Sequence, residues 1–268
     1  LVFAVLSIEG RHGRANVVPY VTRQHWAALL RSDALEMHYQ PLLDLQTGRI
    51  YKVEALARLR EGQRLLGPGE FFPALLPSDF VTLYERGLQQ VLDQRQRWLD
   101  EGIEMAVSLN LPSSALVDPR YFDVTQRVLR EQACPAGVLT LELLETGSFP
   151  HGSEVVEAFE KFKSLGVRLA EDDLGAGYSG LARLREMPFD QIKIDRSIVQ
   201  NVERDPFDVL RFIYQLTRLG HALGKRVALE GVEDVALLEA ARILGANAVQ
   251  GYVVAKPMPG AAFRDWLA

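Results

Sequence analysis

Polar side chains recur near the carboxyl end of one apolar, strand-like run after another. They are Glu54, Asn110, Glu142 with Glu145, Asp172 with Asp173, Lys193 with Asp195, Glu230 with Glu233, and Gln250. Burying even one carboxylate without a partner costs several kcal/mol, so a buried group of carboxylates requires cations. Hard divalent ions with oxygen ligands, Mg²⁺ or Mn²⁺, meet that requirement. The pattern therefore predicts a carboxylate-bound divalent metal site.

Any one of these acids, taken alone, is better explained as a helix cap or as a salt bridge just beyond a strand. Independent caps have no reason to recur at the same point of every unit, so the recurrence favours one shared site. The five histidines are scattered and the single cysteine is Cys134, so no zinc-type spacing competes.

Lys193 adds a cation to the acidic set. It lies between Ile192 and Ile194, which makes a surface lysine the weaker interpretation. Two bound ions about 3.5–4 Å apart can activate a water and stabilise both the attacking and the leaving oxygen of a phosphoryl transfer. Lys193 could hold that water or the charge that develops on phosphorus. Phosphoryl-transfer chemistry with two ions is the resulting prediction.

A competing signal lies in EDDLGAGYSG (171–180), which contains the G-x-G-x-x-G of dinucleotide-binding oxidoreductases. Asp195 follows Gly175 by 195 − 175 = 20 residues, the spacing of a ribose-binding acid. A pyrophosphate loop, however, presents bare backbone N–H groups, and Asp172 and Asp173 would repel a phosphate unless metal ions lay between. We therefore interpret the glycines as a loop beside a metal-binding aspartate pair, with the oxidoreductase as the weaker alternative.

The elements that must position these side chains alternate regularly along the chain. Helical periodicity marks 84–102, 205–224 and 234–245, and the last two begin at N-cap aspartates. The expected strands are 38–45, 51–59, 104–111, 139–145, 167–173, 191–196, 226–232 and 248–254. The first two are joined by a glycine-containing turn of hairpin length, so we expect them to be antiparallel. The pattern predicts an α/β fold, a TIM-like (β/α)₈ barrel; an open doubly wound sheet is the alternative.

Composition narrows the class of protein. The 268 residues, 48% hydrophobic and 24% charged, are typical of a globular protein. A net charge of −5 argues against a DNA or RNA polymer as partner, and a single cysteine suits a reducing, cytoplasmic compartment. The opening run LVFAVLSI is too short to span a bilayer, so no membrane contact is expected from this segment; a membrane anchor in an upstream part of the full-length protein is the alternative. Because the chain has no initiator Met, we expect residues 1–24 to be a linker or the remnant of a preceding sensor or signalling domain, and residues 25–268 to form the barrel.

Eight ordered motifs resemble those of the EAL-domain family of cyclic di-GMP phosphodiesterases. They are YQPLLDL, EALAR, SLNL, LELLET, EDDLGAGYS, IKIDRS, LEGVE and QGYVVAKPMP, from about residue 25 to the end. The resemblance implies a (β/α)₈ barrel whose first strand is antiparallel. It also implies hydrolysis of one phosphodiester of cyclic di-GMP to the linear dinucleotide pGpG with Mg²⁺ or Mn²⁺, and a homodimer.

Carried over by motif, the resemblance implies a role for each polar residue of the site. The ligands of one metal ion are matched by Glu54, Asn110, Glu142 and Asp172, and those around a second by Asp172, Asp173 and Glu230. The catalytic set is matched by Lys193, which positions the water, Glu230, the proposed general base, and Glu54.

The remaining implied roles concern the substrate and the loop after the fifth strand. Arg58 and Gln40 resemble the residues that meet phosphate and guanine, and Leu56 lines the same pocket. Glu233 and Gln250 complete the site, and Glu145 resembles a residue that holds the loop.

That loop departs from the family, whereas every metal-site position agrees. The family usually has DDFGTGYSS where this chain has DDLGAGYSG, so Leu174 replaces an aromatic residue and Ala176 a hydroxyl-bearing one. Loss of the hydroxyl removes a hydrogen bond worth about 1 kcal/mol. Glu171 is an acid where an apolar residue is usual, and strand alternation turns it away from Asp172. An alternative function therefore stays open: a catalytically weak or inactive module that binds cyclic di-GMP and signals to a partner. Retention of the water-activating residues favours the enzyme.

Overall fold

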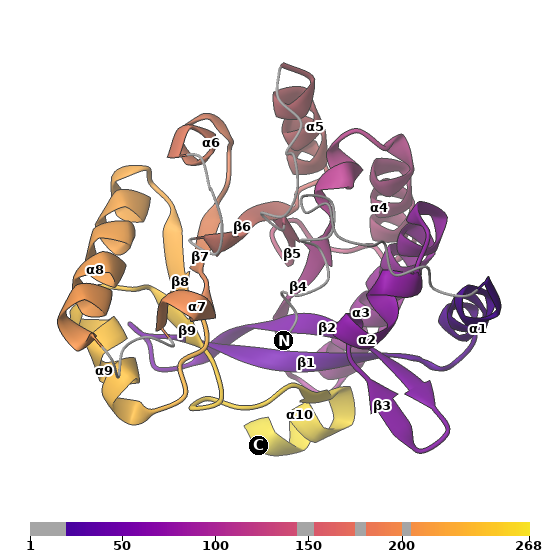
Figure 1. Cartoon of the computed structure of the whole chain (residues 1–268), viewed down its shortest axis with the longest axis horizontal. Coiled ribbons are helices and arrows are strands. Elements are labelled where there is room, and N and C mark those ends of the chain that lie inside the picture. The colour runs from indigo at the N-terminus through magenta and orange to yellow at the C-terminus, as the bar shows by residue number, and fades with distance from the viewer. Residues whose placement is uncertain (1–19, 144–152, 175–180, 200–204) are drawn as a thin grey trace.

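Eight strands close into a barrel in the computed structural model, which describes residues 20–143, 153–174, 181–199 and 205–268 (Figure 1). The barrel strands are β1 (Leu35–Asp44), β2 (Ile50–Glu61), β4 (Ala106–Leu111), β5 (Leu139–Leu143), β6 (Arg168–Leu174), β7 (Gln191–Ile194), β8 (Arg226–Leu229) and β9 (Ala248–Gln250). Each of them overlaps one strand expected from the sequence. The predicted TIM-like (β/α)₈ barrel is confirmed.

Strand β1 closes the ring because it pairs with both β2 and β9, antiparallel to each. Every other neighbouring pair around the barrel is parallel. The predicted antiparallel first strand is therefore present. Two short strands that the sequence pattern did not predict extend the sheet: β3 (Arg64–Leu66) pairs with β2, and β10 (Met258–Pro259) pairs with β1. Three and two residues are too few to show a two-residue periodicity.

Helices cover the outside of the barrel. They are α1 (Tyr20–Arg31), α2 (Pro68–Phe71), α3 (Pro77–Asp100), α4 (Pro119–Glu131), α5 (Ser153–Ser164), α6 (Leu181–Glu186), α7 (Arg196–Val199), α8 (Pro206–Ala222), α9 (Val235–Ile243) and α10 (Gly260–Leu267). Helices α8 and α9 lie on one side of the strands and α3 and α4 on the other (Figure 1). Among the described helices, none combines the length and the apolar character needed to cross a membrane. The proposed boundary between residues 24 and 25 falls inside α1, and the division into linker and barrel stays a prediction.

The helix ends show what the sequence pattern could and could not locate. Asp205 caps α8 as expected, and its side chain accepts a hydrogen bond from the Asp208 N–H at 3.1 Å. Asp234 caps α9 in the same way and accepts a hydrogen bond from the Leu237 N–H at 2.8 Å. The expected start of α3 at residue 84 is wrong, because the helix begins at Pro77. Its N-cap residue, Leu76, has no polar side chain, and the cap is completed by Asp79, which accepts the Leu76 N–H at 3.0 Å.

An aromatic cluster holds the last helix against the barrel. The Trp98 ring on α3 meets the Tyr39 ring of β1 and the Phe263 ring of α10, with centroids 4.8 and 4.9 Å apart. The Trp98 indole also donates to the Gly260 carbonyl at 3.1 Å. Edge-on and tilted rings at this separation stabilise a core beyond the area they bury, so α3 and α10 together support the strand that closes the barrel.

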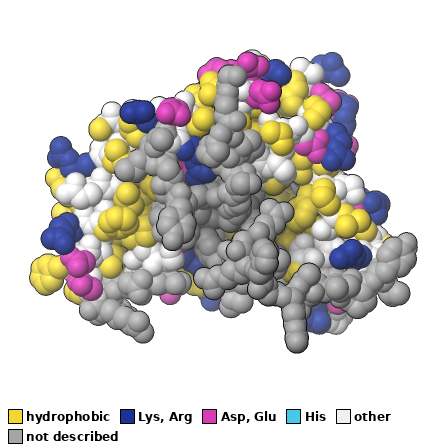
Figure 2. All heavy atoms as spheres, turned by 45° about the horizontal axis from the view of Figure 1, so that its top comes forward, with side chains coloured by type: hydrophobic (Ala, Val, Ile, Leu, Met, Phe, Trp, Pro, Cys, Tyr) yellow, Lys and Arg dark blue, Asp and Glu magenta, His cyan; other side chains and the backbone are white. Residues whose placement is uncertain are grey.

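Charge is not segregated on the part of the surface that can be followed in the space-filling view. Basic and acidic described side chains are interspersed around the edge of that face (Figure 2). A mixed surface of this kind favours solubility rather than attraction of one charged polymer.

Two glycines allow the segments after β8 and β9 to pack together. Gly231 has φ of +66°, which L-residues rarely adopt. A Cβ on Gly251 would lie 2.0 Å from the Val232 carbonyl oxygen. The two segments are also joined by a hydrogen bond, which the Val232 N–H donates to the Gln250 carbonyl at 3.1 Å. Close backbone contact at Gly251 therefore sets the distance between the ends of β8 and β9.

We expect Gly251→Ala to destabilise the protein by about 2 kcal/mol or more, because the new methyl group must displace backbone rather than a flexible side chain. The measurement is urea unfolding. Gly67→Ala is the matched control, since no atom lies within 4 Å of a Cβ there and φ is −86°, and it should cost less than about 1 kcal/mol. Equal losses for the two variants would contradict this packing argument.

Candidate metal and active site

The ammonium group of Lys193 lies at the centre of the acidic cluster. Its Nζ is 3.1 Å from Glu54 Oε2, 2.6 Å from Glu142 Oε2, 3.1 Å from Asp172 Oδ1 and 2.5 Å from Glu230 Oε1. Lys193 is only 1% exposed. The structure thus brings together one buried cation and four carboxylates that are far apart in the sequence.

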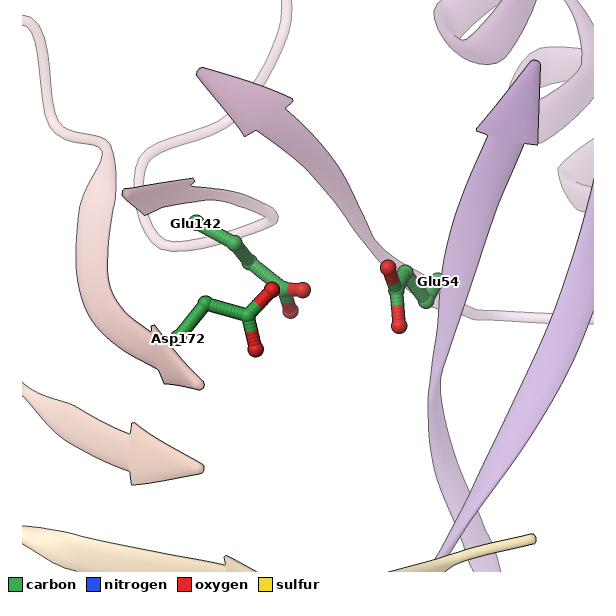
Figure 3. Close-up of side chains that lie close together, drawn as sticks. All are labelled: Glu54, Glu142 and Asp172. Carbon is green, nitrogen blue, oxygen red and sulfur yellow. The ribbon is translucent and has the colours of Figure 1, made fainter. Parts of the chain in front are cut away.

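The barrel geometry explains this convergence. Parallel strands place their carboxyl ends at one end of the barrel, and inward-facing side chains there meet across its axis. Glu142 and Asp172 come from adjacent strands, and Glu54 reaches toward them from β2 (Figure 3). Oxygen atoms of these three carboxylates lie within 4.8 Å of one another. The three residues could therefore hold one metal ion.

A β-bulge shapes the aspartate pair on β6. Glu171 is in register with Ile192 of β7, but the next pair is Leu174 with Ile194, so β6 has one extra residue there. Asp172 and Asp173 lie inside this interval. Bulges of this kind occur next to active sites, where they redirect a side chain. The side chain of Asp173 lies outside the described part of the chain, and its role stays a prediction.

Glu171 points away from the cluster, as strand alternation predicts. Its carboxylate is completely buried and forms an ion pair with Arg183 of α6. Leu174, on the same face of β6, packs with Leu184 and Ile192 in an apolar cluster. The unusual acid therefore joins β6 to α6 and takes no part in the cluster around Lys193.

Amide side chains complete the polar lining. Asn110 Nδ2 donates to Glu54 Oε1 at 2.9 Å, and Gln250 Nε2 donates to Glu54 Oε2 at 2.8 Å. Gln250 Nε2 also lies 3.2 Å from Gln40 Oε1, and Gln40 donates to the Ala255 carbonyl. The oxygens Asn110 Oδ1 and Gln250 Oε1 are buried and have no hydrogen-bond partner among the described residues. Both are suited to accept a cation or a substrate donor.

The electrostatics of the cluster follow from an excess of acid. Burial raises the pKa of Asp172 to about 7, and Lys193 only partly opposes this. Burial and the neighbouring acids also hold the pKa of Glu230 well above its usual value. Burial alone would raise the pKa of Glu142, but Lys193 and Lys52 lower it to about 2. Burial disfavours the charge of Lys193, yet the four carboxylates raise its pKa well above the ordinary value. One ammonium group cannot neutralise four acids, and the pKa values of Asp172 and Glu230 are raised accordingly.

This arrangement fits a hard divalent cation. The donor atoms are carboxylate and amide oxygens, with an unpartnered oxygen on Asn110 beside them. Oxygen-only sets suit Mg²⁺ or Mn²⁺, and added positive charge would neutralise acids that otherwise bind protons. The residues present therefore fit the ion expected from the sequence.

Within the described ranges, some predicted site residues form no hydrogen bond or ion pair with this cluster. Glu233 is exposed and has no recorded hydrogen bond or ion pair within the described ranges. Arg58 is partly buried on β2, where its guanidinium donates to the Ala57 carbonyl at 2.8 Å, and Leu56 lies on the same face of the strand. Glu145 and Ala176 lie outside the described residues.

Sequence reasoning missed a second layer beneath the cluster. Lys52 Nζ lies 3.4 Å from Glu142 Oε1 and 3.0 Å from Gln191 Oε1, and all three residues are buried. The signal was present in the sequence. Lys52 precedes Glu54 by two residues and Gln191 precedes Lys193 by two, so each shares its strand face with a site residue.

Fold and site together define a (β/α)₈-barrel protein with an acidic cluster that could hold a metal ion at the carboxyl ends of its strands. The chain matches the family model for the EAL domain over residues 23–257. It belongs to the EAL domain family.

Curated relatives share this domain. Cyclic di-GMP phosphodiesterase NbdA of Pseudomonas aeruginosa is 32% identical over 89% of this chain and 31% of its own length. Cyclic di-GMP phosphodiesterase PdeR of Escherichia coli is 31% identical over 88% of this chain and 36% of its own length. The chain thus spans about a third of the length of these two relatives.

Solved structures agree with the fold. The structure described as PaMucR phosphodiesterase in complex with c-di-GMP has a TM-score of 0.83 and 28% identity, covering 91% of this chain and 99% of that one. An EAL domain protein from Listeria monocytogenes has a TM-score of 0.76 and 27% identity, covering 93% of this chain and 98% of that one.

The raised pKa of Asp172 predicts that divalent metal binding strengthens with pH. The unfolded carboxyl titrates near 3.8 and the folded one at about 7, so folding favours the protonated form. The resulting stabilisation is full below the unfolded value and is lost as the pH rises through the folded value. A metal ion requires the deprotonated carboxylate. We therefore expect the affinity for Mn²⁺ to rise about tenfold from pH 6 to pH 8.

Isothermal titration of the metal-free protein with Mn²⁺ at the two pH values measures this effect. Asp172→Asn supplies a neutral amide at the same position and should weaken the pH dependence as well as the affinity. An affinity that does not change between pH 6 and pH 8, or that falls, would contradict the prediction.

Proposed function

We propose that this protein is a metal-dependent phosphodiesterase that hydrolyses cyclic di-GMP to linear pGpG. The observation that carries the proposal is the placement of one buried lysine against four strand-end carboxylates. Such a set serves water activation and phosphoryl transfer better than it serves stability, since buried ion pairs add little net stability. The names of the relatives NbdA and PdeR support the choice of substrate.

Two divalent ions, Mg²⁺ or Mn²⁺, are the proposed cofactors. The first would be held by Glu54, Asn110, Glu142 and Asp172, and the second by Asp172, Asp173 and Glu230. When bound, such ions lower the pKa of a water molecule and neutralise charge on the phosphate.

Proton transfer falls to Glu230 and Lys193 in this proposal. Glu230 Oε1 already lies 2.5 Å from the Lys193 ammonium. In its deprotonated form, a carboxylate with a raised pKa is a stronger base than an ordinary glutamate, so Glu230 could then accept the proton of the attacking water. Lys193 can donate hydrogen bonds to that water and to the charge developing on phosphorus.

Substrate binding is assigned in this proposal to side chains near the acidic cluster. Arg58 has no recorded ion pair among the described residues, so its planar guanidinium is available to a phosphate. Gln40 and Gln250 carry amides that can pair with guanine edges, although each now bonds within the protein. Leu56 would line the substrate-binding pocket. Glu233 would contact the substrate from its exposed position beyond β8.

The wider context is proposed on the same basis. Because the relatives are longer than this chain, we expect an upstream sensor or signalling domain in the full protein. We also expect a homodimer in which the loop after β6 connects the dimer contacts with the metal site. Glu145, Leu174 and Ala176 would contribute to that connection. Leu174 is buried in the apolar cluster with Leu184, so its effect on the site would pass through packing.

The direct test is incubation with cyclic di-GMP in Mg²⁺ or Mn²⁺, followed by chromatography for pGpG. We expect turnover in the wild type and a loss of about 100-fold or more in Glu54→Gln, which removes one carboxylate from the cluster. Glu61→Gln is a matched control on the same strand, because Glu61 forms only surface ion pairs, with His25 and Arg64, among the described residues, and it should stay within about twofold.

Tight binding of cyclic di-GMP without pGpG, at several protein concentrations, would contradict the enzyme. That result would instead support the alternative function, a receptor module that uses the altered loop for signalling. Turnover restored by Ala176→Thr would locate the defect in the loop rather than in the metal site.

A further inference from the structure

One buried cation has no part in the proposed mechanism. Lys52 is 2% exposed and lies one layer beneath the acidic cluster, on the same face of β2 as Glu54. Its Nζ contacts Glu142 Oε1 at 3.4 Å and Gln191 Oε1 at 3.0 Å. Burying an ammonium group away from water costs free energy, so we expect the contacts of Lys52 to have a structural or functional role.

The two oxygens of Glu142 face different cations. Oε2 lies 2.6 Å from Lys193, in the centre of the cluster, and Oε1 lies toward Lys52 below it. Gln191 anchors Lys52 from β7, and Glu142 is completely buried. Each carboxylate oxygen of Glu142 therefore lies beside a different ammonium group, Oε2 beside Lys193 and Oε1 beside Lys52.

The number of oxygens that a carboxylate offers decides which ions it suits. Mg²⁺ requires near-octahedral coordination at about 2.0–2.1 Å, whereas Ca²⁺ takes about 6–8 oxygens at 2.3–2.6 Å and often binds a carboxylate through both. We propose that Lys52 is a positioning residue that restricts Glu142 to one oxygen and so makes the site favour Mg²⁺ or Mn²⁺ over Ca²⁺. This inference rests on the proposed divalent-metal site.

A purely structural role for Lys52, neutralising a buried acid, has a different consequence. Mn²⁺ and Ca²⁺ carry the same charge, so loss of the lysine charge changes the affinity for both in the same direction. The orientation of Glu142 changes one affinity relative to the other. The ratio of the two dissociation constants therefore reports it, and a matched buried-lysine variant controls for general loosening of the site.

The experiment is calorimetric titration of the full metal-free chain with Mn²⁺ and with Ca²⁺, in wild type and Lys52→Met. Methionine retains the length of the side chain and removes the ammonium group. We expect the ratio of the Ca²⁺ to the Mn²⁺ dissociation constant to fall about fivefold or more, as Ca²⁺ gains the second oxygen of Glu142. An unchanged or increased ratio overturns the inference.

Two further variants keep the test decisive. Lys225→Met is the matched control, because Lys225 is also buried but donates to the Met187 and Phe189 carbonyls. This variant should leave the ratio of the two dissociation constants unchanged. A fall in the ratio equal to that of Lys52→Met would overturn the inference. Gln191→Leu removes the anchor of Lys52, and we expect a smaller fall in the ratio. If Lys52→Met does not fold, the ratio in Gln191→Leu decides.

The outcomes separate this inference from the proposed function. If the wild type hydrolyses cyclic di-GMP and the ratio does not change, only the role of Lys52 is refuted. If the ratio falls but the wild type yields no pGpG, the phosphodiesterase proposal fails and the role of Lys52 stands. A wild type that binds neither ion refutes the selectivity inference.

Discussion

Electrostatic compensation within the buried acidic cluster is the constraint on which the rest of this structure depends. Four carboxylates surround the Lys193 ammonium at 2.5–3.1 Å. Lys52 supplies a second cation from below. Two positive charges against four acids leave a deficit that protons on Asp172 and Glu230, or divalent cations, must make up. A cluster so poorly neutralised by its own side chains is suited to divalent metal ions and adds little to stability.

The barrel is the means by which this cluster is held together. Carboxylates repel one another, so each must be carried by backbone that cannot move away, and paired strands supply that rigidity. The antiparallel β1 places Gln40 opposite Glu54 in the ladder, and parallel pairing places Asn110 beside Glu142. The bulge in β6 adds one residue at the aspartate pair. Outside the strands, the aromatic contacts of Trp98 and the close backbone approach at Gly251 maintain the positions of β1 and β9.

Much of this could be predicted because local patterns report local structure. All eight barrel strands were located, since most are short apolar runs bounded by a turn or by helical segments. Capping aspartates located the starts of α8 and α9. The start of α3 was missed because its capping group, Asp79, lies inside the helix instead of before it. Spacing of two residues places Lys52 and Gln191 on the strand faces of Glu54 and Lys193, but the contact between them crosses the barrel and does not follow from either strand alone.

The sequence by itself predicted the type of chemistry: acids, amides and one lysine recur at strand ends, a pattern that favours cation-assisted chemistry. It also determined the order of strands and the antiparallel hairpin, which depend on neighbouring residues. The tertiary structure decided which of these side chains meet. Glu54 and Lys193 are 139 residues apart and lie in contact, Glu171 turns outward to Arg183, and Glu233 stays on the surface. Contacts across a closed barrel depend on register and face, which no single segment of sequence contains.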